Sequence, residues 1–63
     1  MCLSTAYANE TDDSRILMKN VMTVECDIGK VILIDLFGHR LEIDGTLKKA
    51  SLTDGYVIVK TAP

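Results

Sequence analysis

The sequence predicts an all-β protein: one domain, residues 1–63, folded as a small, strongly bent barrel of five to six short antiparallel strands. Hydrophobic residues make up 48% of the chain, and they fall in short runs separated by glycine, asparagine and aspartate, which is typical of strands joined by tight turns. No segment is convincing as a long helix. Closing the sheet into a barrel would also remove exposed strand edges.

The first predicted strand covers residues 2–8, whose side chains alternate as expected for a strand with one face on a core. It ends in the polar stretch NETDDS, residues 9–14. The next segment, residues 15–26, fits either a helix or two strands that meet at Lys19-Asn20. Strands are favoured because β-branched residues cluster at its end and a hairpin sequence, DIGK with Gly29, follows it.

Residues 30–37 form the most apolar segment of the chain and are predicted to be the central strand. Gly38 ends this run, and residues 40–44 then alternate as a half-exposed strand would. Asp44-Gly45 has the composition of a two-residue turn, so we expect a new strand after it.

The last two predicted strands cover residues 46–52 and 56–60, joined by a turn at residues 53–55. Lys48-Lys49 interrupts the alternation between Leu47 and Ala50, which predicts a bulge or sharp bend.

Charge and cysteine content exclude several classes of protein. Seven Lys and Arg against nine Asp and Glu leave a net charge of −2, which disfavours nucleic-acid binding, and the Lys48-Lys49 pair is interpreted as a solvated strand face. Two cysteines are too few for a secreted disulfide scaffold. No signal peptide is visible, so none is expected, and the longest apolar stretch, residues 31–34, cannot span a bilayer. The expected location is the cytoplasm.

Three segments, in this order and spacing, resemble the CooT family, small nickel-binding accessory proteins linked to nickel supply for carbon monoxide dehydrogenase. They are MCLSTAY (residues 1–7), IDLFG (residues 34–38) and LEIDGTLK (residues 41–48), followed by a Val- and Ile-rich strand. The resemblance implies an SH3-like β-barrel that forms a homodimer, binds Ni(II) through Cys2 and serves a nickel-requiring enzyme or its maturation machinery. His39 and Cys26 depart from the family's pattern.

The chemistry of Cys2 is consistent with this role. Ni(II) with sulfur and nitrogen ligands favours square-planar geometry. If Met1 is retained, its α-amine, the Cys2 amide nitrogen and the Cys2 sulfur could bind; if Met1 is removed, the Cys2 amine and thiolate remain. Either set leaves the plane incomplete, and a twofold dimer could complete it with one metal per dimer. Copper would compete for the same donors.

The other candidate residues are weaker. His39 is expected to be a solvated loop residue. Cys26 lies between Glu25 and Asp27, whose charges oppose thiolate formation, and is expected to be a packed or half-exposed residue at a strand end. No nucleophile, base and orienting group occur in a recognisable arrangement, so the chain is predicted not to be an enzyme. The alternative function is a metal-free barrel that binds a protein or RNA, with Cys2 buried at a strand start.

Overall fold

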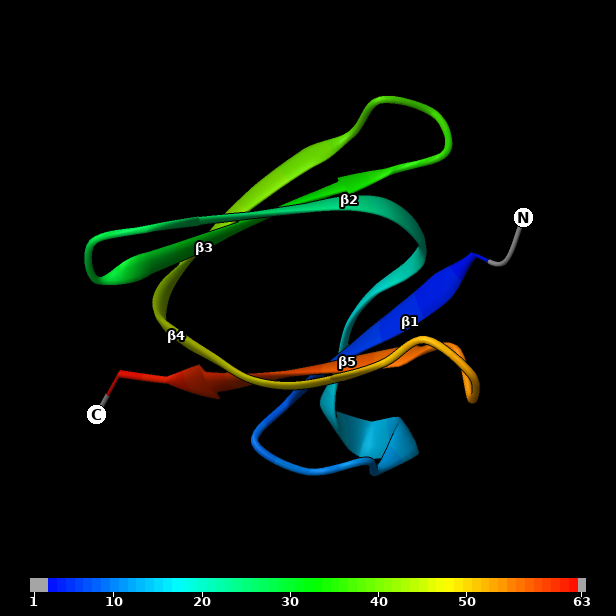
Figure 1. Cartoon of the computed structure of the whole chain (residues 1–63), viewed down its shortest axis with the longest axis horizontal. Coiled ribbons are helices and arrows are strands. Elements are labelled where there is room, and N and C mark those ends of the chain that lie inside the picture. Colours follow the sequence, from blue (N-terminus) through cyan, green and yellow to red (C-terminus); the bar gives the residue numbers. More distant parts are fainter. Residues whose placement is uncertain (1–2, 63) are drawn as a thin grey trace.

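The computed structural model describes residues 3–62 and shows five strands in a closed barrel of order β1-β2-β3-β4-β5 (Figure 1). The elements are β1 (Ser4–Ala8), the 3-10 helix η1 (Asp13–Arg15), β2 (Ile16–Asp27), β3 (Lys30–Asp35), β4 (Arg40–Ser51) and β5 (Tyr56–Thr61). The all-β prediction is confirmed. Consecutive strands pair antiparallel, and the barrel closes through one parallel pair, β1 with β5. Within residues 3–62, no helix is long and apolar enough to cross a membrane.

Strand β2 is a single bent strand rather than a helix or two separate strands. Its first half pairs with β1 and its second half with β3. The bend lies where the sequence suggested a break, since Asn20 has a φ of 57° and the register shifts between Val21 and Thr23. Asparagine tolerates this backbone region better than most residues, so the chain turns a corner without ending the strand.

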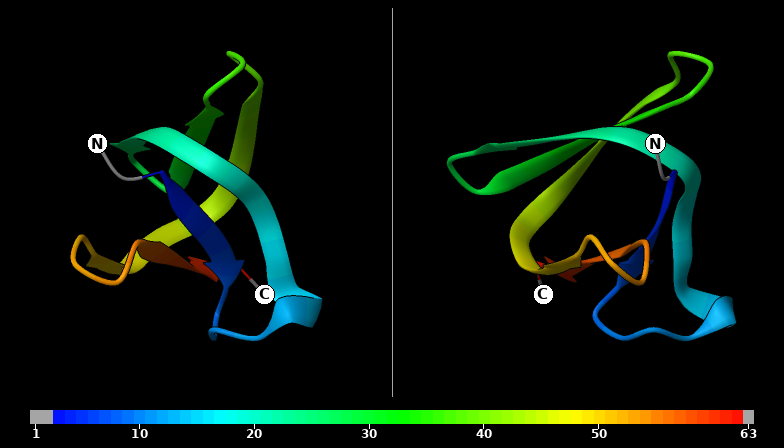
Figure 2. Two further views of the ribbon diagram at one scale, coloured as in Figure 1. Left: turned by 90° about the vertical axis from the view of Figure 1, so that its right-hand side faces the viewer. Right: turned by 45° about the vertical axis from the view of Figure 1, so that its right-hand side comes forward.

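Strand β4 also turns a corner, and here the predicted turn at Asp44-Gly45 is wrong. Up to Asp44 the strand pairs with β3, and from Gly45 onward it pairs with β5. Gly45 has a φ of 151°, and a Cβ placed on it would lie 2.1 Å from the carbonyl oxygen of Lys60. Glycine is needed at this position because the backbones of β4 and β5 come so close together, and not because the chain reverses direction. The strand's curvature around the barrel is visible in Figure 2.

Three other local predictions are confirmed, whereas the central strand predicted over residues 30–37 ends at Asp35, so that Leu36 and Phe37 lie in the loop that follows. Asp27 pairs with Lys30 across a tight hairpin in which Gly29 has a φ of 72°. The amide of Gly55 donates to the carbonyl of Ser51, which closes the turn before β5. The register of β4 against β5 shifts between Leu47 and Lys49, so the expected bulge lies at Lys48.

A small core fills the barrel. Strand β3 contributes Val31 and Leu33, both fully buried, and Ile32 on its other face is also buried. The core cluster consists of Ala6, Val21, Val31, Leu33, Val57 and Val59. Because every strand except β4 contributes to this cluster, the core holds the barrel closed and fixes β1 between β2 and β5.

Candidate functional site

The predicted nickel ligand Cys2 lies outside the described residues, but the end of the barrel to which it is attached is well defined. Leu3 leads into β1, where Ser4 pairs with Val21 of β2. On the other side, the amide of Thr5 donates to the carbonyl of Gly55 at 3.0 Å. The start of β1 is therefore held on both sides by neighbouring strands or turns.

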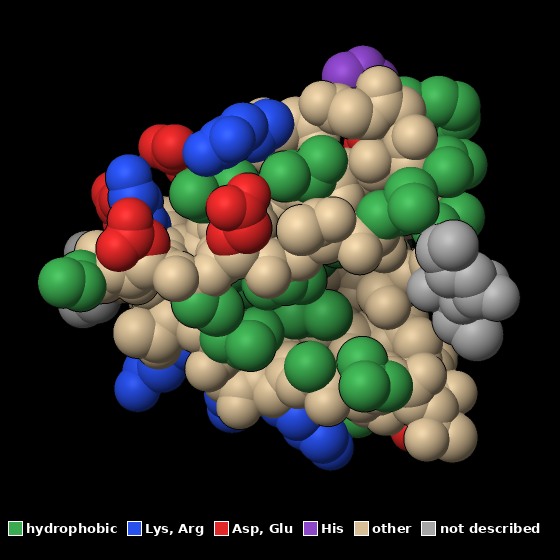
Figure 3. Space-filling model, turned by 45° about the horizontal axis from the view of Figure 1, so that its top comes forward, with side chains coloured by type: hydrophobic (Ala, Val, Ile, Leu, Met, Phe, Trp, Pro, Cys, Tyr) green, Lys and Arg blue, Asp and Glu red, His purple; other side chains and the backbone are tan. Residues whose placement is uncertain are grey.

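An apolar hollow of about 290 Å³ opens beside the start of β1. Its lining comes from all parts of the barrel except β3: Ser4, Val21, Met22, Val24, Ala50, Leu52 and Val57. Met22 is the residue that the β2 bulge leaves without a register partner, and nearly half of it is exposed. None of the lining residues is charged. Figure 3 shows hydrophobic side chains gathered on this side of the molecule, around the hollow.

His39 is exposed in the β3–β4 loop, as predicted, and is held by Asp35. One carboxylate oxygen of Asp35 accepts from the amides of Phe37 and His39, both at 2.9 Å, and the other lies 2.9 Å from Nδ1 of His39. Desolvation opposes ionisation of Asp35, but the hydrogen bonds from His39 and Phe37 outweigh it, so the pKa of Asp35 lies below its usual value. The pair thus orders the loop.

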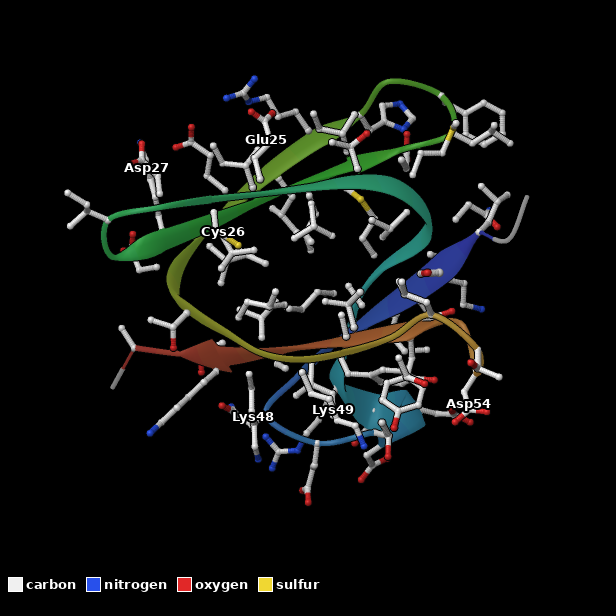
Figure 4. The ribbon with its side chains drawn as sticks, viewed as in Figure 1. Glu25, Cys26, Asp27, Lys48, Lys49 and Asp54 are labelled. Carbon is white, nitrogen blue, oxygen red and sulfur yellow. The ribbon has the colours of Figure 1, made fainter. Side chains whose placement is uncertain are left out.

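Cys26 is exposed on β2, between Glu25 and Asp27 (Figure 4). It is more exposed than the packed or half-exposed position that the sequence suggested. Cys26 pairs with Val31 close to the hairpin, five residues along β2 from Val21, the partner of Ser4. At about 3.3 Å per residue, this separation is roughly 16 Å. The structure therefore does not bring Cys26 to the start of β1.

The two lysines of β4 make surface contacts. The ammonium of Lys49 lies 5.6 Å from the centre of the Tyr56 ring, and a hydrogen bond with the Tyr56 side chain raises the pKa of Lys49. Lys48 donates to the carbonyl of Asn9 at 3.2 Å. Both side chains point away from the barrel interior (Figure 4), in agreement with a solvated strand face.

Sequence reasoning missed the apolar surface at the start of β1. Among residues 3–62, no three His, Cys, Asp or Glu side chains are grouped so that they could hold a metal ion. The structure brings Met22 and Leu52, which are widely separated in the sequence, to the same hollow, and the amide of Leu36 donates to the carbonyl of Asn20 in β2. A weak signal was present, because Leu36-Phe37 directly precedes Gly38 and so falls in a loop instead of a strand.

Comparison with known proteins identifies the family. The family model for the CO dehydrogenase accessory protein CooT matches residues 1–60. An uncharacterized protein of Methanocaldococcus jannaschii is 37% identical over 60 residues, which cover 95% of this chain and 98% of that protein. The crystal structure of a protein assigned as CooT from Carboxydothermus hydrogenoformans matches with a TM-score of 0.81 over 98% of this chain and 100% of the other, at 19% identity, and confirms the fold. The family resemblance seen in the sequence is thereby confirmed, and the chain belongs to the CO dehydrogenase accessory protein CooT family.

Proposed function

We propose that this protein handles nickel for the maturation of CO dehydrogenase and binds Ni(II) through Cys2 at the interface of a homodimer. The observation that supports this most directly is the family match, which begins at residue 1 and so includes Cys2. The proposed role is that of a chaperone, buffer or sensor of the ion, with the rigid barrel as its mount and without a catalytic step.

The donor chemistry supports nickel. A thiolate is a soft ligand, and with amine or deprotonated amide nitrogens it provides the strong-field set that square-planar Ni(II) prefers. Retention of Met1 offers one sulfur and two nitrogens per chain, and its removal offers one sulfur and one nitrogen. In the second case, two chains related by a twofold axis supply two nitrogens and two sulfurs, which complete one plane.

The composition of the chain favours a site shared between two copies. The sequence contains two cysteines and one histidine, and Cys26 lies roughly 16 Å along β2 from the partner of Ser4. His39 is a single residue in the β3–β4 loop, where Nδ1 lies 2.9 Å from Asp35 and Nε2 alone could serve as a donor. A second copy of Cys2 is the simplest source of the missing donors.

The test is a Ni(II) titration of untagged protein whose native N-terminus has been verified by mass spectrometry. We expect one tightly bound nickel per dimer, with thiolate-to-nickel charge-transfer absorption that disappears in Cys2→Ser. Cys26→Ser is the matched control, because it makes the same chemical change at an exposed thiol away from β1, and it should leave the absorption intact, as should His39→Ala.

Nickel binding by Cys2→Ser equal to that of the wild type would refute the proposal. If neither protein binds nickel, the chain is a metal-free barrel whose partner is another macromolecule; if both bind it, the nickel ligands lie elsewhere in the chain. Loss of the absorption in Cys26→Ser or His39→Ala would instead show that the assignment of Cys2 as the ligand has to be revised.

A further inference from the structure

The second half of β2 has an edge to which no strand of the described chain is paired. Pairing of β2 with β1 ends at Val21, opposite Ser4, and residues 23–27 pair in unbroken register with β3. Within residues 3–62, no other strand pairs with β2. Backbone groups of an antiparallel strand alternate between its two edges, so about half of the amide and carbonyl groups of residues 22–27 point away from β3. We call this segment the β2 edge.

An apolar seam lies between the β2 edge and the second half of β4. Within the described chain, residues 46–51 of β4 pair only with β5, so the two half-strands are not joined to each other. Val24 of β2 and Ala50 of β4 line the same hollow, whose lining contains no charged residue. In Figure 4 the side chain of Cys26 points from β2 to the side on which the seam lies. Apolar side chains of another segment could therefore be buried there.

The β2 edge is uncovered although its inner side faces the core. Cys26 pairs with the fully buried Val31 of β3, and side chains of residues paired across two strands project from the same face of a sheet. Cys26 is nevertheless exposed, and Val24 is only partly buried. An uncovered edge with regular register is a site where a further strand can pair. The facing edge of β4 is less suitable, because the bulge at Lys48 interrupts its register.

Two carboxylates flank the β2 edge on its outer side. Glu25 and Asp27 point away from the seam (Figure 4), and no ion pair within residues 3–62 involves either of them. A strand added at this edge would place alternate side chains beside these carboxylates and the remaining side chains over the seam. Opposite charges on neighbouring strands attract. The complementary strand therefore has Lys or Arg at the first set of positions and apolar residues at the second.

We propose that the β2 edge binds an extended segment of another protein in which Lys or Arg alternates with apolar residues. The segment would add a fourth strand to the sheet formed by β2, β3 and the first half of β4, with affinity from main-chain hydrogen bonds and specificity from the alternating side chains. A second copy of β2 is a poorer occupant, because twofold pairing of this edge would bring the Glu25 and Asp27 carboxylates of both copies together. This interaction requires neither nickel nor Cys2, so it is independent of the proposed function.

The probe is a short, blocked peptide in which valine alternates with lysine, added to the whole chain in reductant and without metal. Isothermal titration calorimetry measures the affinity, and amide hydrogen exchange followed by NMR reports where the peptide binds. We expect exchange of the outward-pointing amides of residues 22–27 to slow at least about tenfold on binding, with no comparable change in residues 46–51. A peptide in which valine alternates with glutamate should bind more weakly.

Two charge reversals test the role of the carboxylates. Glu25→Lys should weaken binding of the valine–lysine peptide at least about fivefold and improve binding of the valine–glutamate peptide. Glu42→Lys is the matched control, because Glu25 and Glu42 both pair with Ile32, on opposite sides of β3, and the two variants have the same net charge. Since Glu42 lies outside the β2 edge, Glu42→Lys should change the affinity less than about twofold. Circular dichroism verifies that both variants are folded.

Any of four results would overturn the inference. The first is a wild type that does not bind the valine–lysine peptide, and the second is a bound peptide that leaves exchange of residues 22–27 unchanged. The third is equal weakening by Glu25→Lys and Glu42→Lys, which would show unspecific charge attraction. The fourth is protection of residues 22–27 without peptide, in a dimer seen by sedimentation equilibrium, because a second copy would then occupy the edge. All measurements are made without metal, so none of these results bears on the nickel site.

Discussion

Replacing Gly45 by alanine should unfold most of the protein, because this glycine lies where β4 passes from β3 to β5. An added Cβ would lie 2.1 Å from the carbonyl oxygen of Lys60 and 3.0 Å from both its carbonyl carbon and the Cα of Thr61. All three are backbone atoms of β5, so no side-chain rotation can relieve the overlap. The strands would have to separate where Gly45 pairs with Thr61.

The magnitude follows from two contributions. A non-glycine residue held at a φ of 151° carries backbone strain of about 1–3 kcal/mol, and forcing an extra methyl group into a packed site costs about 1–3 kcal/mol more. Their sum, roughly 2–6 kcal/mol, is comparable to the ~3–5 kcal/mol that a single core supplies in a domain of this size. The folded fraction of Gly45→Ala should therefore be small.

Urea denaturation followed by circular dichroism, at one fixed protein concentration, measures this effect. Gly29→Ala is the matched control, since Gly29 also has a positive φ, 72°, but has no atom within 4 Å of the added Cβ. The control should lose only about 1–2 kcal/mol and retain a clear unfolding transition. If the two variants are destabilised within about 0.5 kcal/mol of each other, the close approach of β4 and β5 at Gly45 is refuted.

Three further predictions follow from the core, the β3–β4 loop and the metal chemistry. Leu33→Ala, which removes part of the largest fully buried side chain, should cost about 2–5 kcal/mol of unfolding free energy, measured by the same urea transitions; a loss below about 1 kcal/mol would contradict the described core. The pKa of Asp35 is lowered in the folded state, so its stabilising contribution is complete above the unfolded pKa of about 3.9 and is lost as the pH falls through the lower folded value. Between about pH 5 and about pH 2.5, the thermal unfolding temperature of Asp35→Asn should therefore fall less than that of the wild type. If the two proteins have the same pH profile, the Asp35 carboxylate does not contribute to the pH dependence of stability. For the proposed nickel site, equimolar Cu(II) should displace bound Ni(II) at equilibrium, seen by metal analysis after desalting, and retention of nickel would show that the site selects against copper by geometry.

Most of the secondary structure was predictable because it depends on local chemistry. Gly29 in the hairpin and the turn at residues 53–55 have the compositions that such turns require, and the alternating or continuous apolar runs predict strands. The wrong prediction, a turn at Asp44-Gly45, has a clear reason. An Asp-Gly dipeptide fits a tight turn that reverses the chain, and it also fits a bent strand whose backbone passes very close to another strand. Only the close approach of Gly45 to the Lys60 backbone shows that the second case applies here.

Cys2 can be identified as a candidate ligand from residue chemistry and from the family's N-terminal motif, because ligand type and order along the chain are properties of the sequence itself. The contribution of Asn20 to the bend of β2, the capture of His39 by Asp35 and the parallel closure of β1 on β5 depend on which strands become neighbours. The same is true of the apolar hollow beside the start of β1, whose lining comes from β1, β2, β4, β5 and the β4–β5 turn. Exposure is decided by what the folded chain leaves uncovered, so hydrophobic residues of equal character in the sequence become core at Leu33 and surface at Phe37 only once the barrel has closed.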